Sequence, residues 1–319
     1  VNDAPVLDNT ATPAGAAVLE DALAPVGAVG TLVSALVDFS GGGGNDNVSD
    51  VDAGAVTGIA ITGADSTNGD WFYSTDGGTT WTALGAVADG TAMLLAPDAR
   101  LYFQPDANYD GSADITFRAW DQTSGANGTT ADTTINGGTT AFSTATDTAT
   151  FDVTPVNDAP VLDNSGTPTL PSITEDETTN AGRTVALIVG ASISDVDSGA
   201  VEGIAITGLT SGNGTWQYSI DGGTTWTDVG TVTEDSALLL RSTDLVRFVP
   251  NGENGTTADI SYRAWDQTSG TEGTKVDTNP GNGGTTAFST AIDTASITVT
   301  SVNDAPVLDN TATPAGAAV

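Results

Sequence analysis

The chain has no cysteine, no histidine and only 7 basic residues among 319. Without cysteine there is no disulfide framework. Lacking both residue types, it has neither the usual thiol and acyl-transfer catalysts nor a typical transition-metal site. The shortage of lysine and arginine excludes nucleic acid and anionic membrane surfaces, which are bound through basic patches. No apolar run approaches the ~20 residues of a membrane-spanning helix. We therefore expect neither an enzyme nor membrane insertion.

Acidic residues, by contrast, are abundant. There are 41 of them, and the formal net charge is −34. So large an excess of one sign repels itself in a compact chain. Divalent cations would offset it, and calcium, which prefers oxygen ligands, is the cation we expect. The alternative is a solubilising surface without bound metal, as in a protein adapted to salt.

The sequence repeats itself. The segment Val1–Asn9 recurs at Val156–Asn164 and again at Val302–Asn310. A spacing of this size gives repeats as long as ordinary domains. The repeats cover residues 1–155 (repeat 1), 156–301 (repeat 2) and 302–319 (the start of a third). Most of the length difference between the first two lies in residues 41–47, which have no counterpart in repeat 2.

Segments rich in Val, Ile, Thr and aromatics alternate with clusters of Gly, Asn and Asp, a pattern typical of short strands. The expected strands include residues 57–62, 71–74, 100–104, 114–120 and 149–154. No segment has a sustained helical period. About seven strands per repeat predict an all-β chain of tandem immunoglobulin-like β-sandwich domains in a linear array. A proline near the start of each repeat predicts a stiff, extended linker.

Carboxylate and amide side chains recur at matching positions in the repeats. Calcium takes six to eight oxygen ligands, so clusters of this kind are candidate sites. The bland alternative is that these residues cap turns, which Asp does often. The candidates are Asn2, Asp3, Glu20, Asp50, Asp52, Asp106, Asp110, Asp121, Asn157, Asp158, Glu175, Asp195, Asp197, Glu253, Asp266, Asn303 and Asp304.

These motifs resemble the cadherin-like repeats of large bacterial surface proteins, such as the long adhesins exported by type I secretion (RTX adhesins). Residues 156–160 (Val-Asn-Asp-Ala-Pro) look like the cadherin linker, and residues 195–199 (Asp-Val-Asp-Ser-Gly) like its Asp-x-Asp loop. Glu175 resembles the early glutamate, and Asp266 the later single aspartate. The resemblance covers both repeats and implies calcium at the junctions between successive domains.

Carried over residue by residue, the resemblance implies three sets of ligands. The central junction would take Glu20, Asp106, Asp110, Asn157, Asp158, Asp195, Asp197 and Asp266. The next would take Glu175, Glu253, Asn303 and Asp304. An upstream junction would take Asp50, Asp52 and Asp121, with Asn2 and Asp3 as its linker residues. The linker is one residue shorter than in cadherins, and the acidic pair before the Trp strand fits poorly. The number of ions per junction is therefore left open.

Three other features bear on function. Residues 74–81 and 219–226 match the Asp-box pattern of sialidases. One box per repeat and six arginines in all do not make a sialidase site, so we expect tight hairpins with the Trp packed on the base. Trp120 and Trp265 could stack on sugars if exposed, but packing against the long loops 122–147 and 267–293 is the favoured expectation.

The sequence as a whole predicts a calcium-rigidified extender or fibre segment of an extracellular, surface-attached bacterial adhesin, of the kind that takes part in biofilm formation. Its partners would be calcium ions and neighbouring repeats or copies of itself. One alternative is a binding module that recognises surface polysaccharide or mediates self-association into a surface fibre. A glycosidase built on paired carboxylates is the third possibility.

Overall fold

A computed structural model describes residues 1–39 and 44–308. The chain divides into two compact units, Val1–Val156 (unit 1) and Asn157–Val319 (unit 2), and each is described by itself. Residues 41–43 of the 41–47 insertion, and the third repeat beyond residue 308, lie outside the described residues. Within the described part, no helix is long and apolar enough to cross a membrane.

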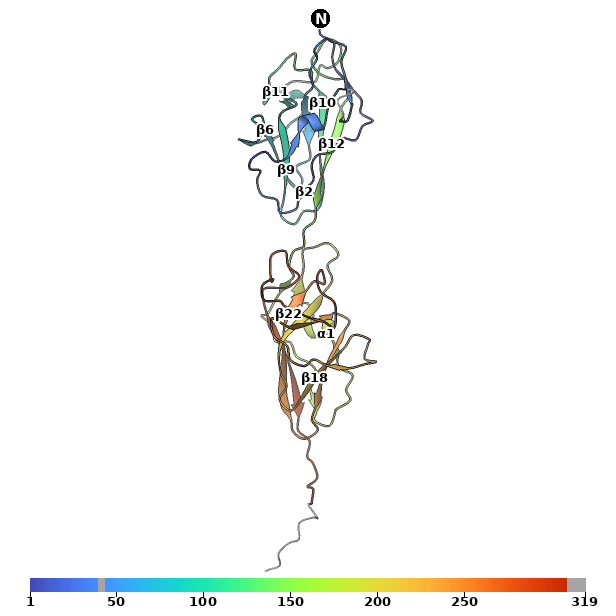
Figure 1. Cartoon of the computed structure of the whole chain (residues 1–319), viewed down its shortest axis with the longest axis vertical. Coiled ribbons are helices and arrows are strands. Elements are labelled where there is room, and N and C mark those ends of the chain that lie inside the picture. Colours follow the sequence, from blue (N-terminus) through green and yellow to red (C-terminus); the bar gives the residue numbers. More distant parts are fainter. Residues whose placement is uncertain (40–43, 309–319) are drawn as a thin grey trace, which may run out of the picture. The chain divides into compact units, whose positions relative to one another are not determined.

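The regular secondary structure of unit 1 is almost all strand, joined by long loops (Figure 1). They are β1 (Val6–Leu7), β2 (Val18–Leu19), β3 (Thr31–Leu32), β4 (Val48–Ser49), β5 (Ile59–Ala64), β6 (Gly69–Ser74), β7 (Thr82–Ala83), β8 (Ala92–Leu95), β9 (Arg100–Pro105), β10 (Gly111–Ala119), β11 (Thr130–Ala131) and β12 (Asp147–Thr154). Two 3₁₀ turns, η1 (Val33–Ala35) and η2 (Asp89–Thr91), complete it. All five strands expected from the sequence are present within a few residues.

In the described part of unit 1, one sheet has the order β11-β8-β5-β10-β12-β2 and a second the order β3-β9-β6-β7. The short pair β1-β4 stands beside them. Strand β12 alternates strictly between buried and exposed or half-buried residues, as a strand with one face on the core should. Trp71 of β6 meets Phe103 of β9 and Phe151 of β12, with ring centroids 5.0 and 4.8 Å apart. The core therefore lies between the two sheets.

Unit 2 repeats this architecture (Figure 1). Its strands are β13 (Val161–Leu162), β14 (Ile173–Thr174), β15 (Arg183–Thr184), β16 (Ile193–Ser194), β17 (Gly203–Thr210), β18 (Gly214–Ser219), β19 (Thr227–Asp228), β20 (Ala237–Arg241), β21 (Leu245–Pro250), β22 (Thr256–Trp265), β23 (Lys275–Val276) and β24 (Asp293–Thr300). The sheets have the orders β14-β24-β22-β17-β20-β23 and β15-β21-β18-β19, with the pair β13-β16. Tandem β-sandwich domains, the fold class expected from the sequence, are what the structure shows.

One helix was not expected. Helix α1 (Val185–Val189) stands where unit 1 has the 3₁₀ turn η1. Its five residues are too few for a periodic pattern to emerge from the sequence. The core of unit 2 buries Val185, Ile188 and Val189 of this helix. Packing rather than intrinsic helix propensity therefore explains why α1 forms.

The long loop of each unit covers the outer face of the larger sheet. Trp120 is 2 % exposed and packs with Ala141 and Phe142 of the loop, and its indole donates to the Ser124 carbonyl at 2.8 Å. Trp265 is buried in the same way against Phe288. The packing expectation is confirmed, and stacking of sugars on these two side chains is wrong because their rings are covered.

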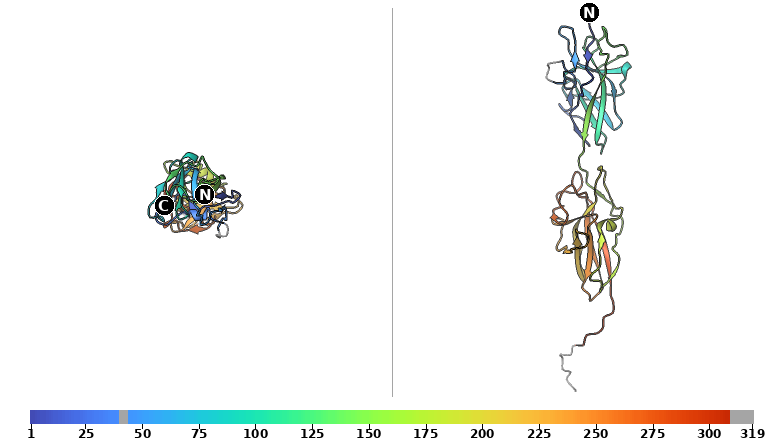
Figure 2. Two further views of the ribbon diagram at one scale, coloured as in Figure 1. Left: turned by 90° about the horizontal axis from the view of Figure 1, so that it is seen from above. Right: turned by 90° about the vertical axis from the view of Figure 1, so that its right-hand side faces the viewer.

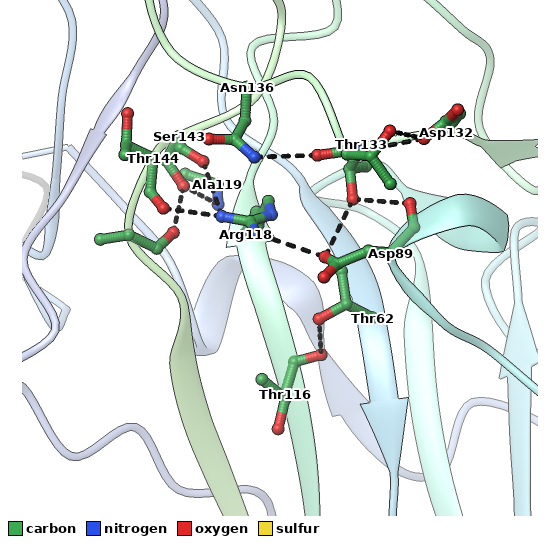
Figure 3. Close-up of polar contacts among 12 residues, drawn as sticks. Thr62, Asp89, Thr116, Arg118, Ala119, Asp132, Thr133, Asn136, Ser143 and Thr144 are labelled. Atoms are coloured by element: carbon green, nitrogen blue, oxygen red, sulfur yellow. Dashed lines mark hydrogen bonds and ion pairs between the residues drawn. The ribbon is translucent and has the colours of Figure 1, made fainter.

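A buried arginine ties this loop to the sheet (Figure 3). Arg118 on β10 donates to the carbonyls of Ser143 (3.2 Å) and Thr144 (2.7 Å) and pairs with Asp89 at 3.3 Å. Thr133 of the loop donates from its backbone N–H to the Asp89 carbonyl. In unit 2, Arg263 donates to the carbonyls of Ser289 and Thr290 and forms an ion pair with Glu234 at 2.9 Å. Each loop is thus anchored by one internal charge.

The Asp-box segments form hairpins, as expected, but not tight ones. Strands β6 and β7 pair across a loop over residues 75–81 that Asp76 closes internally. The Thr80 backbone N–H and hydroxyl donate to Asp76 at 2.9 and 2.7 Å. These two bonds, and then one from Ser74, lower the pKa of Asp76 to about 2. Trp81 packs on Tyr102 of β9, with centroids 6.0 Å apart, rather than on the hairpin base.

Candidate metal centres at the ends of each unit

The candidate ligands gather at the two ends of each unit. In each unit the first segment lies at one end and the last long strand leads to the other (Figures 1 and 2). We call these the entry end and the exit end. The entry cluster of unit 1 comprises Asn2, Asp3, Asp50, Asp52 and Asp121, and that of unit 2 comprises Asn157, Asp158, Asp195, Asp197 and Asp266. The exit glutamates are Glu20 in unit 1 and Glu175 in unit 2.

Hydrogen bonds join the entry cluster of unit 1. The Asn2 side-chain amide donates to Asp121 Oδ2 at 2.9 Å and to the Thr140 carbonyl at 3.1 Å. The Asp3 backbone N–H donates to Asp52 Oδ2 at 2.9 Å, and the Asp52 N–H to Asp50 Oδ1 at 2.9 Å. The first segment, the loop after β4 and the end of β10 therefore converge on one place.

The entry cluster of unit 2 has the same connections. The Asn157 amide donates to Asp266 Oδ2 at 2.9 Å. The Asp158 N–H donates to Asp197 Oδ2 at 2.9 Å, and the Asp197 N–H to Asp195 Oδ1 at 3.0 Å. Two independent copies thus place these five residues alike.

Some carboxylate oxygens in these clusters are buried without a donor. Among the described residues, no hydrogen bond reaches Asp50 Oδ2 in unit 1 or its counterpart Asp195 Oδ2 in unit 2. A buried acceptor that lost its water needs a compensating partner, and leaving it unpaired costs roughly 1–3 kcal/mol. A cation on these oxygens would supply that partner.

Sequence reasoning did not identify the threonines that hold the single aspartates. The backbone N–H and hydroxyl of Thr123 donate to Asp121 Oδ1 at 2.8 and 2.6 Å. Thr268 does the same for Asp266. Both bonds use Oδ1, while Oδ2 accepts the asparagine amide of the first segment. The recurrence of Asp-Gln-Thr in both repeats was the available signal.

The exit glutamates hold the chain as it leaves each unit. Glu20 is 5 % exposed and accepts the Val156 backbone N–H on Oε1. Glu175 is 1 % exposed and accepts the Val302 N–H at 2.8 Å. Glu175 Oε2 is buried and accepts no hydrogen bond from the described residues. The exit end of unit 2 therefore has an orphaned acceptor of the same kind as the entry clusters.

The remaining candidates are less closely placed. Asp106, Asp110 and Glu253 are exposed, and among the described residues no hydrogen bond joins their side chains to an exit glutamate. In unit 1 the loop that carries Asp106 and Asp110 contacts the residue after Glu20. The Asn108 backbone N–H donates to the side-chain Oδ1 of Asp21 at 3.0 Å. Asn303 and Asp304 follow Val302 and are exposed.

Negative charge is concentrated at the entry end of each unit. Burial raises the pKa of Asp195, and the neighbouring Asp197 and Asp266 raise it further. Within the described chain, the ion pairs involve Asp89, Glu234, Asp244 and Glu272, none of which belongs to a cluster. No arginine or lysine therefore neutralises these carboxylates. An all-oxygen ligand set without nitrogen or sulfur fits a hard divalent cation such as Ca²⁺.

No family model and no curated protein matches the chain. Among solved structures, mouse cadherin-23 EC22-24 overlaps 95% of this chain and 68% of that one, at 13% identity and a TM-score of 0.43. The CupB6 tip adhesin from Pseudomonas aeruginosa overlaps 94% of this chain and 99% of its own, at 10% identity and a TM-score of 0.26. At these TM-scores neither similarity identifies a family or a function.

Proposed function

We propose that this chain is a calcium-rigidified extender or fibre segment of an extracellular bacterial surface adhesin, with calcium bound where successive units join. The observation that carries the proposal is a set of buried carboxylate oxygens that accept no hydrogen bond from any residue the structure describes: Asp50 Oδ2, Asp195 Oδ2 and Glu175 Oε2. Asp50 lies at the entry end of unit 1 and Glu175 at the exit end of unit 2, whereas the linker joins the exit end of unit 1 to the entry end of unit 2. The burial of these two side chains is therefore a property of each unit alone.

Chain connectivity supports placing calcium at the junction. The Val156 backbone N–H donates a hydrogen bond to Glu20 of unit 1. The side-chain amide of the next residue, Asn157, donates one to Asp266 of unit 2. Consecutive Cα atoms lie about 3.8 Å apart. The exit glutamate of one unit and the entry cluster of the next are therefore held by adjacent residues of one chain.

The expected gain from calcium is neutralisation of like charges together with a direct tie between units. Extracellular modules that bind calcium do so at roughly 10⁻⁴–10⁻³ M, which suits an extracellular setting. A segment of this kind has no catalytic step to perform. It acts as a spacer that separates the surface to which the protein is attached from what the protein reaches.

A calorimetric calcium titration tests the proposal. Asp195→Asn keeps the shape of the side chain but removes one candidate ligand charge, and we expect calcium affinity at that site to fall at least about tenfold. Asp228→Asn is the matched control, because Asp228 is exposed on β19 and belongs to neither cluster. Equal losses in the two variants would show that calcium only screens the overall charge. No binding by the unaltered chain at millimolar calcium would contradict the proposal outright.

A further inference from the structure

Asparagine followed by glycine is the pair of residues most open to spontaneous deamidation, because glycine has no side chain to shield its backbone nitrogen from the asparagine amide. The chain contains seven such pairs. Their asparagines are Asn68, Asn127, Asn136, Asn213, Asn251, Asn254 and Asn282. The structure places Asn251 in surroundings unlike those of the asparagines in the long loops.

The three pairs in the long loops are anchored on both residues. We call Asn127, Asn136 and Asn282 the control asparagines. The N–H of the glycine that follows each of them donates to a backbone carbonyl, at 2.8, 2.8 and 2.7 Å. Each control side chain also makes a hydrogen bond with the backbone. The attacking nitrogen and its target are therefore both held in place.

The pair Asn251–Gly252 lies in the loop between β21 and β22. Among the residues that the structure describes, none accepts the Gly252 N–H. Asn251 is exposed, and its Oδ1 accepts the Glu253 backbone N–H at 3.1 Å. This Asx turn folds the side-chain carbonyl back toward the intervening Gly252 nitrogen. The nitrogen is thus free to react, and its target is held beside it.

We propose that Asn251 is a site of spontaneous deamidation, in which its amide becomes a carboxylate. The Gly252 nitrogen loses its proton to solvent and bonds to Asn251 Cγ. The Glu253 N–H, which already reaches Oδ1, stabilises the negative charge that develops on that oxygen. The Cγ–Nδ2 bond then breaks, and ammonia leaves a five-membered succinimide ring. Water opens the ring to aspartate or, by attack on the main-chain carbonyl, to isoaspartate.

The product adds charge at the exit end of unit 2. Asn251 has the place of Asp106 in unit 1, because both backbone N–H groups donate at 2.9 Å to the asparagine that precedes the paired strand. The loop lies beside the exit glutamate, since a Cβ built on Gly252 would be 4.0 Å from the Glu175 carbonyl oxygen. Deamidation therefore gives unit 2 the carboxylate that the sequence encodes in unit 1. A role for it in calcium binding rests on the proposed function, but the reaction does not.

Peptide mapping of the whole chain tests the reaction. The chain is incubated with chelator at mildly alkaline pH, once folded and once in guanidinium chloride, and chymotryptic peptides are followed by mass spectrometry. Fragment ions assign the mass change to Asn251 or to Asn254, which share a peptide. In the folded chain we expect Asn251 to convert at least about tenfold faster than the control asparagines, which must first break two hydrogen bonds.

The unfolded sample shows whether structure causes this difference. In guanidinium chloride the rates should become similar, because only the local sequence then acts. Equal rates in the folded chain, or a difference that persists after unfolding, would overturn the proposal. Since both samples contain chelator, neither result bears on calcium, and the proposed function is tested separately.

Gly252→Ala supplies the second test. A Cβ at this position has room, but the backbone φ of +78° disfavours alanine and the methyl group shields the nitrogen. Conversion of Asn251 should fall at least about tenfold. The rates at the control asparagines should stay the same, which would show that the fold is intact. An unchanged rate at Asn251 would contradict attack by the Gly252 nitrogen.

Discussion

Units 1 and 2 share the residues of the entry cluster and the exit glutamate, but they differ on the outer face of the smaller sheet. The five residues of the entry cluster and the exit glutamate are identical in the two units. On the outer face of the smaller sheet, Phe72 and Tyr102 of unit 1 are replaced by Gln217 and Arg247. There Trp226 lies under the Arg247 guanidinium at 3.9 Å, whereas Trp81 meets Tyr102 edge-on. The smaller sheet thus exchanges aromatic for cation–π packing, while the entry cluster and the exit glutamate keep the same residues.

The cores also differ at a buried tyrosine–aspartate pair. In unit 2 the Tyr262 hydroxyl donates to Asp293 Oδ2 at 3.3 Å. In unit 1 the corresponding pair is Phe117 and Asp147, and Asp147 Oδ2 accepts no hydrogen bond from the described residues. Burial raises the pKa of Asp147, with a smaller contribution from the charge of Asp8. Unit 1 thus holds a buried carboxylate that unit 2 has satisfied.

The largest effect should come from removing the loop-anchoring arginines. Arg263→Met leaves two loop carbonyls and the Glu234 carboxylate without their donor, and we expect unit 2 to lose about 2–3 kcal/mol of unfolding free energy. Arg118→Met should do the same to unit 1, with a somewhat smaller loss because its ion pair is longer. Scanning calorimetry that resolves the two transitions would measure both.

The matched control for the arginine is its acidic partner. Glu234 is 41% exposed, and its ion pair with Arg263 is partly screened by solvent. Glu234→Gln should therefore cost no more than about 1 kcal/mol. If the two substitutions cost the same, the arginine would act through its ion pair and not through the loop carbonyls.

A smaller effect should follow from exchanging the core residues of the two units. Phe117→Tyr supplies Asp147 with the donor that unit 2 already has, and should stabilise unit 1 by about 1 kcal/mol at neutral pH. Tyr262→Phe should destabilise unit 2 by a similar amount. Denaturant unfolding followed by tryptophan fluorescence would show both, and a loss of stability in Phe117→Tyr would mean that unit 1 cannot accommodate the hydroxyl.

The pH dependence gives this exchange a second readout. Because the folded pKa of Asp147 is raised above 3.8, its contribution to stability is fully present below that value and is lost as the pH rises through the folded pKa. A new hydrogen bond to the carboxylate would lower the folded pKa. The loss with rising pH should therefore be smaller in Phe117→Tyr than in the unaltered chain.

Local pattern predicted much of the fold. Residues 149–154 were expected as a strand because the segment is rich in Val, Thr and aromatic residues, and β12 (Asp147–Thr154) has one face on the core. Helix α1 was missed because five residues cannot show a helical period. The partners of Arg118 were missed for another reason: they lie 25 and 26 residues away in an irregular loop. No periodicity encodes such a contact.

The entry clusters were predicted only as a list of residue types. Sequence matching identified Asp50, Asp52 and Asp121 through their recurrence in repeat 2. It could not show that Asn2 meets Asp121 across 119 positions, or that Asp50 Oδ2 is buried without a donor. Those facts depend on how the sheets bring distant loops together. They are also the facts on which the proposal of a cation site rests, beyond the acidic composition.

Small-angle X-ray scattering of the chain, in calcium and then in chelator, tests the central claim most directly. We predict a longer maximum dimension and a narrower distribution of shapes in calcium, since ions that tie Glu20 to the entry cluster of unit 2 would stiffen the junction. The same maximum dimension and the same spread in both conditions, at millimolar calcium, would contradict the account.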